Sequence, residues 1–177
     1  MPEAWLPPDV GPGIALRPWR GDDLDALLEH ANDEQVSRGT SDRFPFPYTR
    51  EDGIAFLAGD VVDLTAPVFA ITLDGRAVGG IGLRTFAGER AVGAEFGYWL
   101  GSRHWGRGIM TEVVAAFAPW AMVALDLQRL QATVLDFNHA SARVLEKNGF
   151  IEEGVLRRAV LKRGRLHDLR MYARLRG

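Results

Sequence analysis

Apolar and polar positions alternate in different ways along the first third of the chain. Residues 14–19 alternate with the period of a strand, whereas the leucines within residues 21–33 recur on one stripe of a helix. Residues 43–49 form an aromatic loop broken by prolines, and Thr49 is expected to cap a second helix that runs to about residue 61. The pattern predicts one strand followed by two helices.

The middle of the chain is rich in β-branched and aromatic residues. Segments 67–75, 76–86 and 91–101 have the composition of strands, and Asp74-Gly75 is a strong hairpin turn between the first two. The period then changes, because apolar residues recur on one helical face from about residue 106 to residue 125. Three antiparallel strands followed by a long helix are expected.

The last third adds a strand at 129–135, a short helix from residue 139 that ends at Asn148-Gly149, and strands at 153–162 and 166–175. The order of elements requires a parallel crossover between the fourth and fifth strands. The predicted fold class is therefore α/β (α+β), with a mixed, mostly antiparallel sheet flanked by four helices.

The length of 177 residues indicates one domain. Residues 1–12, rich in proline and glycine, are expected to form an irregular lead-in, and residues 13–177 a single domain. The first residues lack the basic and apolar regions of a secretory signal, and no stretch approaches the roughly 18 apolar residues that span a bilayer. A cytoplasmic location and no membrane partner are expected.

Charge is distributed unevenly. Residues 1–63 carry thirteen acidic and five basic side chains, and residues 155–177 carry eight basic side chains and one acidic, Asp168. This polarity suits an anionic ligand or an acidic partner near the C-terminus, but solvated strand faces and ion pairs between the two ends explain it as well. No exposed aromatic platform accompanies the basic residues, so no direct nucleic-acid partner is expected.

Residues 98–109 contain the most informative segment, in which a strand enters a turn punctuated by glycines and the turn opens a helix. The first amides of a helix lack intrahelical partners, and the helix dipole adds positive charge there. Gly106 and Gly108 allow close approach of the backbone to an anion, and Arg103 and Arg107 add charge. The segment is typical of a phosphate cradle.

Other phosphate motifs fit this segment less well. A P-loop needs a Lys-Ser/Thr pair after its last glycine, where this chain has Ile109-Met110. A dinucleotide-binding fingerprint needs a third glycine and a parallel βαβ unit, which the preceding antiparallel strands oppose. A tight turn without a ligand remains an alternative to the cradle.

A second segment follows the strand at 129–135. Asn138 stands where a helix N-cap is expected, and Ser141 lies one turn into that helix, beside the predicted cradle. Each residue also has a purely structural interpretation, as a cap and as an ordinary helical serine.

The two segments together carry a family resemblance. Arg103-x-x-Gly106-x-Gly108 resembles the [Gln/Arg]-x-x-Gly-x-[Gly/Ala] signature of the GNAT superfamily of N-acetyltransferases. Further blocks resemble the branch that contains the ribosomal-protein N-acetyltransferases of RimJ/RimL type, over about residues 13–176. These blocks are Gly97-Tyr98-Trp99-Leu100, Trp105 to Glu112, Asn138-x-x-Ser141 with Val144 to Phe150, and Glu153-Gly154-x-Leu156-Arg157.

The resemblance implies the GNAT acyl-CoA N-acyltransferase fold, with the sheet splayed between the fourth and fifth strands, and acetyl-CoA as the acetyl donor. The pyrophosphate would lie on the amides of residues 105–109, the pantetheine arm would run along residues 99–101, and Ser141 would lie near the sulfur. The residues implied for donor binding are Trp99, Leu100, Gly101, Arg103, Trp105, Gly106, Arg107, Gly108, Ile109, Asn138 and Ser141.

The implied reaction is acetyl transfer to a primary amine, and by family analogy the leading acceptor is a protein N-terminal α-amine. A small-molecule amine such as a polyamine, an antibiotic or an amino acid is an alternative, as is a non-catalytic acyl-CoA-binding module. The chain has no cysteine, so direct attack in a ternary complex is favoured over transfer through a protein thiol. The strands at the C-terminus could also pair between subunits, which allows a homodimer.

Glu95 is the leading candidate for the general base, because it is a carboxylate in an otherwise apolar strand segment. Strand parity places it on one face with Gly97 and Trp99, unless a bulge near the splay breaks the alternation. A surface position on the outer face is the alternative. Some members of the resembling branch use a glutamate later in the chain, where this sequence has Val160.

Other residues receive weaker interpretations. Tyr98 is a candidate acid, and the loop at 43–49, with Asp42 and Arg43, is expected on the acceptor side. Asp168 and Tyr172 match a recurring pattern in the last strand of the resembling branch and are interpreted as supports of the final hairpin. His104, His139 and His167 show no spacing typical of metal ligands, so no metal is expected.

Overall fold

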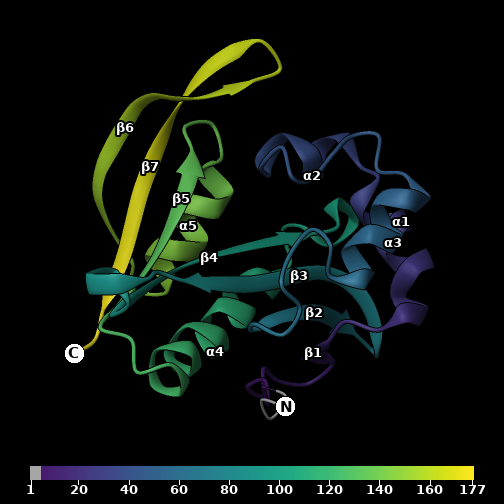
Figure 1. The fold of residues 1–177 in the computed structure, drawn as a ribbon, viewed down its shortest axis with the longest axis horizontal. Coiled ribbons are helices and arrows are strands. Elements are labelled where there is room, and N and C mark those ends of the chain that lie inside the picture. Colours follow the sequence, from purple (N-terminus) through teal and green to yellow (C-terminus); the bar gives the residue numbers. More distant parts are fainter. Residues whose placement is uncertain (1–4) are drawn as a thin grey trace.

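A sheet of seven strands runs through the chain in a computed structural model, which describes residues 5–177 (Figure 1). The strands are β1 (Ile14–Pro18), β2 (Val68–Leu73), β3 (Arg76–Thr85), β4 (Gly93–Leu100), β5 (Arg129–Leu135), β6 (Ile151–Lys162) and β7 (Arg165–Leu175). Their order in the sheet is β1-β2-β3-β4-β5-β7-β6. The predicted strands are thus confirmed, with shifts of a few residues at their ends.

The sheet opens between its fourth and fifth strands. β1 to β4 pair antiparallel, as do β5, β7 and β6, but β4 and β5 are parallel and pair only between Gly93–Glu95 and Arg129–Gln131. Beyond these pairs the strands diverge, and Figure 1 shows β5 rising away from β4. The predicted mixed, mostly antiparallel and splayed sheet is confirmed.

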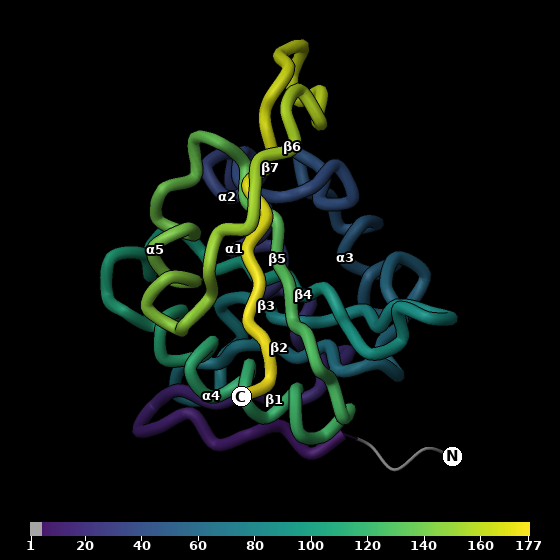
Figure 2. Tube along the Cα trace, turned by 90° about the vertical axis from the view of Figure 1, so that its left-hand side faces the viewer, coloured from purple at the N-terminus to yellow at the C-terminus, as the bar shows by residue number. Residues whose placement is uncertain are grey.

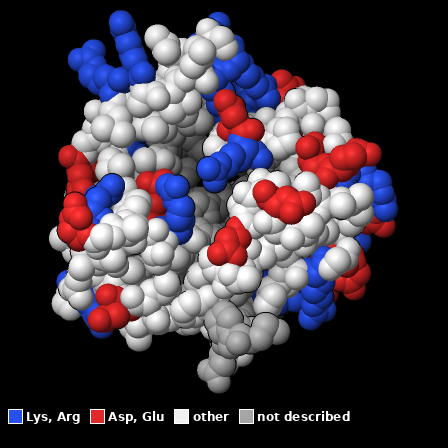
Figure 3. Space-filling view, in the orientation of Figure 1, with Lys and Arg blue, Asp and Glu red and all other residues white. Residues whose placement is uncertain are grey.

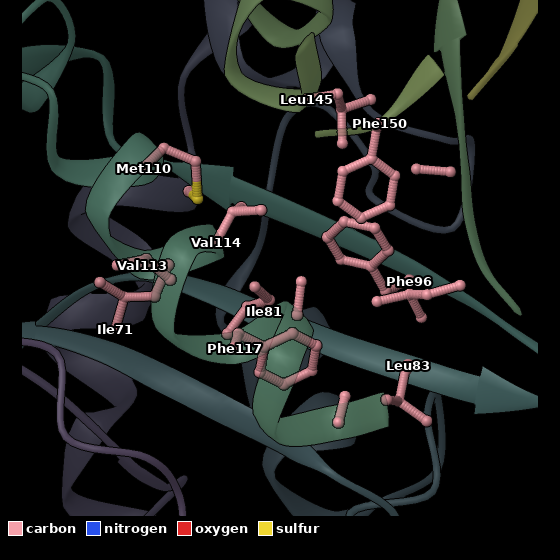
Figure 4. Close-up of a cluster of buried hydrophobic side chains, with 14 of the residues drawn as sticks. Ile71, Ile81, Leu83, Phe96, Met110, Val113, Val114, Phe117, Leu145 and Phe150 are labelled. Atoms are coloured by element: carbon pink, nitrogen blue, oxygen red, sulfur yellow. The ribbon is translucent and has the colours of Figure 1, made fainter. Parts of the chain in front are cut away.

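One face of the sheet packs against α4 (Ile109–Ala124). The first part of the apolar stripe predicted for this helix is buried at Ile109, Val113 and Phe117, whereas Ala124 at its end is exposed, and Phe117 is fully inaccessible to solvent. Its ring lies 6.1 Å from Phe96 of β4, which in turn lies 5.3 Å from Phe150 (Figure 4). This apolar contact holds the middle of α4 against β4.

The opposite face is covered by α1 (Leu24–Ala31) and α3 (Arg50–Ala58) (Figure 1). An aromatic cluster joins these helices to the sheet, since Trp19 stacks on Trp99 of β4 and meets Phe56 of α3 edge-on. β4 therefore lies between two layers, with α1 and α3 on one face and α4 on the other.

All four predicted flanking helices are present, and the described residues contain a fifth α-helix that the sequence did not indicate. The unexpected helix is α2 (Glu34–Gly39). The helix expected from residue 139 is α5 (His139–Lys147). The side chain of Asp33 caps α2 by accepting a hydrogen bond from the amide of Gln35. α3 ends at Ala58 rather than near residue 61, since Gly59 adopts a left-handed conformation with φ of 85°. No helix between residues 5 and 177 is long and apolar enough to cross a membrane.

The β6–β7 hairpin extends beyond the rest of the sheet (Figure 2). The carboxylate of Asp168 accepts a hydrogen bond of 2.7 Å from the amide of Arg158, where β6 carries extra residues relative to β7. Tyr172 is fully buried and donates to Glu146 and Glu152. Both contacts confirm that Asp168 and Tyr172 support the hairpin.

The tip of the hairpin contacts the N-terminal third of the chain. The ammonium group of Lys162, which is buried, donates to the carbonyl of Thr40, and Arg163 forms an ion pair of 2.9 Å with Glu34. Desolvation lowers the pKa of Lys162. The basic end of the chain is therefore partly neutralised by its acidic beginning, as one of the two explanations of the charge distribution requires.

Candidate active site

A cleft of about 1450 Å³ opens where β4 and β5 diverge. It reaches from the start of α4, past the first turn of α5, to the segment between α2 and α3. The space-filling view shows the molecule hollowed near its centre, with basic and acidic side chains at the rim (Figure 3). The two sequence segments with candidate chemistry thus line one cavity.

The turn before α4 has the backbone of an anion site. Gly106 and Gly108 have φ angles of 74° and 77°, a conformation that favours glycine. A Cβ at either position would meet no heavy atom within 4 Å, so the space above both is open. The indole of Trp105 donates a hydrogen bond of 2.8 Å to the carbonyl of Leu100, which anchors the turn to the end of β4. The first amides of α4 therefore face an accessible region with the positive end of the helix dipole.

The two arginines of the turn are engaged with other side chains. Arg103 forms an ion pair of 2.9 Å with Glu29 of α1, and Arg107 contacts the imidazole of His104 at 3.2 Å. Neither lines the cleft, in contrast to Trp105, Gly106, Gly108 and Ile109.

Two basic side chains of α5, and not the arginines of the turn, face the cleft. Arg143 and Lys147 of α5 both line it, and neither was singled out from the sequence. Their spacing of four residues places them on one helical face, which was the available signal.

The edge of β4 that faces the gap can be identified from its hydrogen bonds. The carbonyl of Gly93 accepts from Phe86, and the amide of Gly101 donates to Val78, so the backbone groups of odd-numbered residues point toward β3. The backbone groups of Tyr98 and Leu100 therefore point toward the gap between β4 and β5. The carbonyl of Leu100 already accepts a hydrogen bond from the indole of Trp105. The amide and carbonyl of Tyr98, which the sequence did not indicate, are thus the central polar groups of this edge.

Tyr98 and Ser141 meet across the opening. The phenol oxygen of Tyr98 lies 2.8 Å from the hydroxyl of Ser141 and 3.2 Å from its carbonyl oxygen. Burial raises the pKa of Tyr98 to about 12, so the phenol stays protonated at neutral pH. Asn138 caps α5, because its side-chain oxygen accepts from the amide of Ser141. The capping interpretation of Asn138 is confirmed, and its amide nitrogen is not needed for that role.

Glu95 lies at the last paired position before β4 and β5 separate, opposite Gln131. It lines the cleft, and its carboxylate accepts a hydrogen bond of 3.0 Å from the side chain of Gln131. The β3–β4 register is continuous from Ala94 to Leu100, so the bulge considered from the sequence is not present there. Glu95 therefore shares a face with Gly97 and Trp99, as parity predicts.

Val160, where some members of the resembling branch have a glutamate, lies on the hairpin opposite His167. It does not line the cleft.

Two paired glycines lie on this face of the sheet, one in open space and one against the side chain of Val68. Gly97 is exposed, with no atom within 4 Å of a Cβ built on it, and its register partner on β3 is Gly82. Trp99 forms one wall, with the ring of Phe44 at 5.0 Å. Phe44 belongs to the aromatic loop at 43–49, so that loop both packs the helices and lines the cleft.

Asp42 and Arg43, singled out as residues of the acceptor side, border the same cavity. His104 also borders this cavity and contacts Arg107, and burial lowers its pKa. His167 contacts Asp136.

Comparison with known proteins adds the family context. Residues 14–151 match the family model described as "Acetyltransferase (GNAT) domain". The chain is 36% identical over 96 residues to the uncharacterized N-acetyltransferase YoaA of Bacillus subtilis, a match that spans 54% of each chain. It is 28% identical over 169 residues to the uncharacterized N-acetyltransferase p20 of Bacillus licheniformis, which covers 92% of this chain and 93% of that relative. The ribosomal-protein-serine acetyltransferase of Escherichia coli is 34% identical over 82 residues, or 46% of each chain.

Solved structures share the fold. A GNAT-family acetyltransferase from Bacillus anthracis superposes with a TM-score of 0.80 at 25% identity, over 92% of this chain and 94% of that one. RimL, described as the ribosomal L7/L12 alpha-N-protein acetyltransferase and solved with coenzyme A, superposes with a TM-score of 0.82 at 23% identity, over 94% of this chain and 96% of that one. The second likeness concerns the fold alone.

Proposed function

Because the chain belongs to the GNAT acetyltransferase family, we propose that it moves the acetyl group of acetyl-CoA to a primary amine. The observation that carries the proposal is the cleft itself, which joins a glycine-headed helix N-terminus, a free strand edge and the Tyr98–Ser141 pair. These are the parts needed to hold a phosphate, an amide-containing arm and a leaving thiolate.

The donor's phosphates fit the start of α4. The helix dipole and the unpaired amides attract an anion, and the open space above Gly106 and Gly108 admits it at close range. Arg143 and Lys147 supply positive charge from α5, and we retain Arg103 and Arg107 as charges at the outer side of the turn.

The pantetheine arm fits between β4 and β5 as a substitute for the missing strand pairing. The backbone of Tyr98 faces the gap and offers one donor and one acceptor to the amides of the arm. The side-chain nitrogen of Asn138 is a further donor, since only its oxygen is used in capping α5. The amide of Leu100 points toward the same gap, and Trp99 lines the cleft. Gly101 instead donates its amide to Val78 of β3, so its proposed contribution is to close the end of β4.

The chemistry divides between two groups of residues. Glu95 removes a proton from the acceptor amine, directly or through a water, so that the neutral nitrogen attacks the thioester carbonyl. The carbon–nitrogen bond forms and the carbon–sulfur bond breaks, and the nitrogen releases its surplus proton to water. Ser141 delivers a proton to the departing thiolate of coenzyme A and is reprotonated from water. Transfer is direct, because the chain has no cysteine to carry the acetyl group.

A protein N-terminal α-amine is the acceptor that we propose. Gly97 leaves open space on this face of the sheet, so an extended peptide can lie close to β4 there with its amine toward Glu95. The ribosomal-protein-serine acetyltransferase of Escherichia coli, which is similar over 46% of this chain, supports a protein N-terminus as the acceptor.

An acceptor panel tests this function. Release of the coenzyme A thiol is measured with serine-initiated peptides, polyamines, aminoglycosides and free amino acids, and mass spectrometry locates the acetyl group. We expect peptides to exceed the small amines in kcat/KM by about tenfold or more, equivalent to about 1.4 kcal/mol. Turnover of small amines alone would replace the proposed acceptor, and binding of acetyl-CoA without any turnover would indicate a non-catalytic module.

A further inference from the structure

A chain of side-chain hydrogen bonds connects Glu95 with the far strand of the sheet. Gln131 donates through Nε2 to Oε2 of Glu95 at 3.0 Å, and its own Oε1 accepts from Nε of Arg129 at 2.9 Å. The guanidinium of Arg129 then binds both carboxylate oxygens of Glu153 at 2.9 and 2.7 Å. The chain crosses from β4 through β5 to β6, and none of its links was apparent from the sequence.

The backbone fixes the first link of this chain. Glu95 and Gln131 are partners in the short parallel pairing of β4 and β5, and theirs is the last pair before the strands separate. Gln131 is 5% exposed, whereas Glu95 borders the cleft. The amide of Gln131 is thus held inside the sheet, and the carboxylate lies at the boundary between packed sheet and open cavity.

Arg129 decides which way the amide of Gln131 points. A glutamine side chain can present either its oxygen or its nitrogen to a neighbour, but a guanidinium has only donors. The oxygen of Gln131 must therefore face Arg129, which turns the NH₂ group toward Glu95. The two bonds to Glu153 hold Arg129 in place and direct its charge away from Glu95.

The result is a neutral donor beside Glu95. A hydrogen bond from a neutral amide stabilises the ionised carboxylate less than an adjacent guanidinium would. A carboxylate held by a cation is a weaker base, and at Glu95 the contact is made by a neutral amide instead. One oxygen, Oε2, is committed to Gln131, which leaves Oε1 to accept a proton.

We propose that Gln131, oriented by Arg129 and Glu153, is a positioning residue for Glu95: it selects the carboxylate oxygen that faces the acceptor and holds the carboxylate in its ionised form. This inference rests on the proposed function, in which Glu95 is the general base.

Other charged groups also surround Glu95. Arg84 is its register partner on β3, and Arg129 and Glu153 approach from β5 and β6. The cleft also carries charges from the segments that face β4, namely Arg38, Asp42, Arg43, Asp52 and Asp63. These groups affect the pH at which the acid limb of the pH–rate profile lies. The test therefore compares the position of this limb in each variant with its position in wild type.

The experiment compares Q131L and Q131N with wild type and with the control Q128L. Leucine removes the donor, and asparagine keeps the amide but is too short to reach the carboxylate. Gln128 is exposed and lies on the turn before β5, so its substitution leaves the chain of hydrogen bonds intact. The pH dependence of kcat, the KM for acetyl-CoA and the titration of the Glu95 side-chain carboxyl by carbon NMR are measured for each protein.

Both Gln131 variants are expected to displace the acid limb of the kcat profile upward by about one pH unit, because the ionised carboxylate loses a donor. At the lowest pH values of the profile, kcat then falls about tenfold relative to wild type, and it recovers at higher pH. The KM for acetyl-CoA should stay within about twofold of the wild-type value. Q128L should match wild type. The NMR midpoint of Glu95 should move with the kinetic limb.

Two outcomes would overturn the inference: an acid limb and NMR midpoint unchanged in both folded variants, or a uniform loss of kcat at every pH. Failure of the proposed function gives a different result. If no amine supports turnover, or if E95Q keeps the acid limb, Glu95 is not the base and the catalytic part of the inference falls with it. In that case the NMR midpoint still decides whether Gln131 controls the ionisation of Glu95.

Discussion

The phenol oxygen of Tyr98 and the hydroxyl oxygen of Ser141 lie 2.8 Å apart and join β4 to α5 across the opening of the sheet. Burial raises the pKa of Tyr98 to about 12, so this phenol remains a donor at neutral pH. When the phenol donates to the oxygen of Ser141, the proton of Ser141 is free to move to a thiolate in the cleft. In the proposed reaction, the pair links the position of the donor arm to protonation of the leaving thiolate.

Substitution of Ser141 by alanine should lower kcat by about a hundredfold, because a positioned acid typically contributes this much or more. Y98F should have a smaller effect, of about tenfold, since it removes only the group that orients Ser141. Steady-state rates with the preferred acceptor and calorimetry with acetyl-CoA measure both effects. A kcat for S141A equal to that of wild type, with normal donor binding, would remove Ser141 from the mechanism.

Gly106→Ala should weaken the binding of acetyl-CoA. Its Cβ enters the open space above the turn, where the phosphates are expected, and the φ of 74° strains any residue other than glycine. We expect Kd to rise by about tenfold or more in calorimetry, equivalent to about 1.4 kcal/mol.

Gly164→Ala provides the matched control. Gly164 has a φ of 75° and open space around its Cβ position, but it lies at the tip of the β6–β7 hairpin and does not line the cleft. It should lose stability by about 1 kcal/mol and bind acetyl-CoA normally. Equal weakening in both variants would mean that backbone strain, and not the loss of the cradle, explains the result for Gly106.

Gly97→Val should impair the acceptor and spare the donor. A side chain at this position would project from β4 beside Trp99, where the structure has open space. The expected result is a rise in the KM of the acceptor by about tenfold, with Kd for acetyl-CoA unchanged within about twofold. G154V on the exposed strand β6 serves as the control, since Gly154 also has open space around it. A change in the Kd of acetyl-CoA alone would place Gly97 on the donor side.

His30 should make folding stability depend on pH. Its side chain is buried, and desolvation lowers its pKa below the ordinary value of about 6.5. The unfolded chain therefore binds more protons than the folded chain below about pH 6.5, so stability is full above that pH and falls as pH decreases. Urea denaturation at about pH 7.5 and about pH 5.5 measures the difference.

H30Q cannot titrate and should lose less stability over the same interval, even though it is less stable than wild type at the higher pH. His104, whose pKa burial also lowers, contributes in the same direction, so H104Q is the comparison for a partly exposed histidine. An equal loss of stability in wild type and H30Q would assign the pH dependence to other groups.

Periodicity and turn residues predicted most of the fold because they are local. The strand pattern, the Asp74-Gly75 turn and the left-handed Gly149 each follow from neighbouring residues. α2 was missed because it is only six residues long and has no apolar stripe long enough to be recognised. Its capping residue, Asp33, is recognisable only once the helix is known.

Contiguous residues encode the order of the elements and the glycine-headed start of α4, so both could be predicted before the structure was known. The partners of the reactive side chains depend instead on the three-dimensional arrangement of the strands and helices. It paired Glu95 with Gln131 and Tyr98 with Ser141, and it turned Arg103 toward Glu29 instead of the cleft. The physical reason is that strand register and the divergence of β4 from β5 bring together side chains that are distant in the sequence, and no local pattern specifies those contacts.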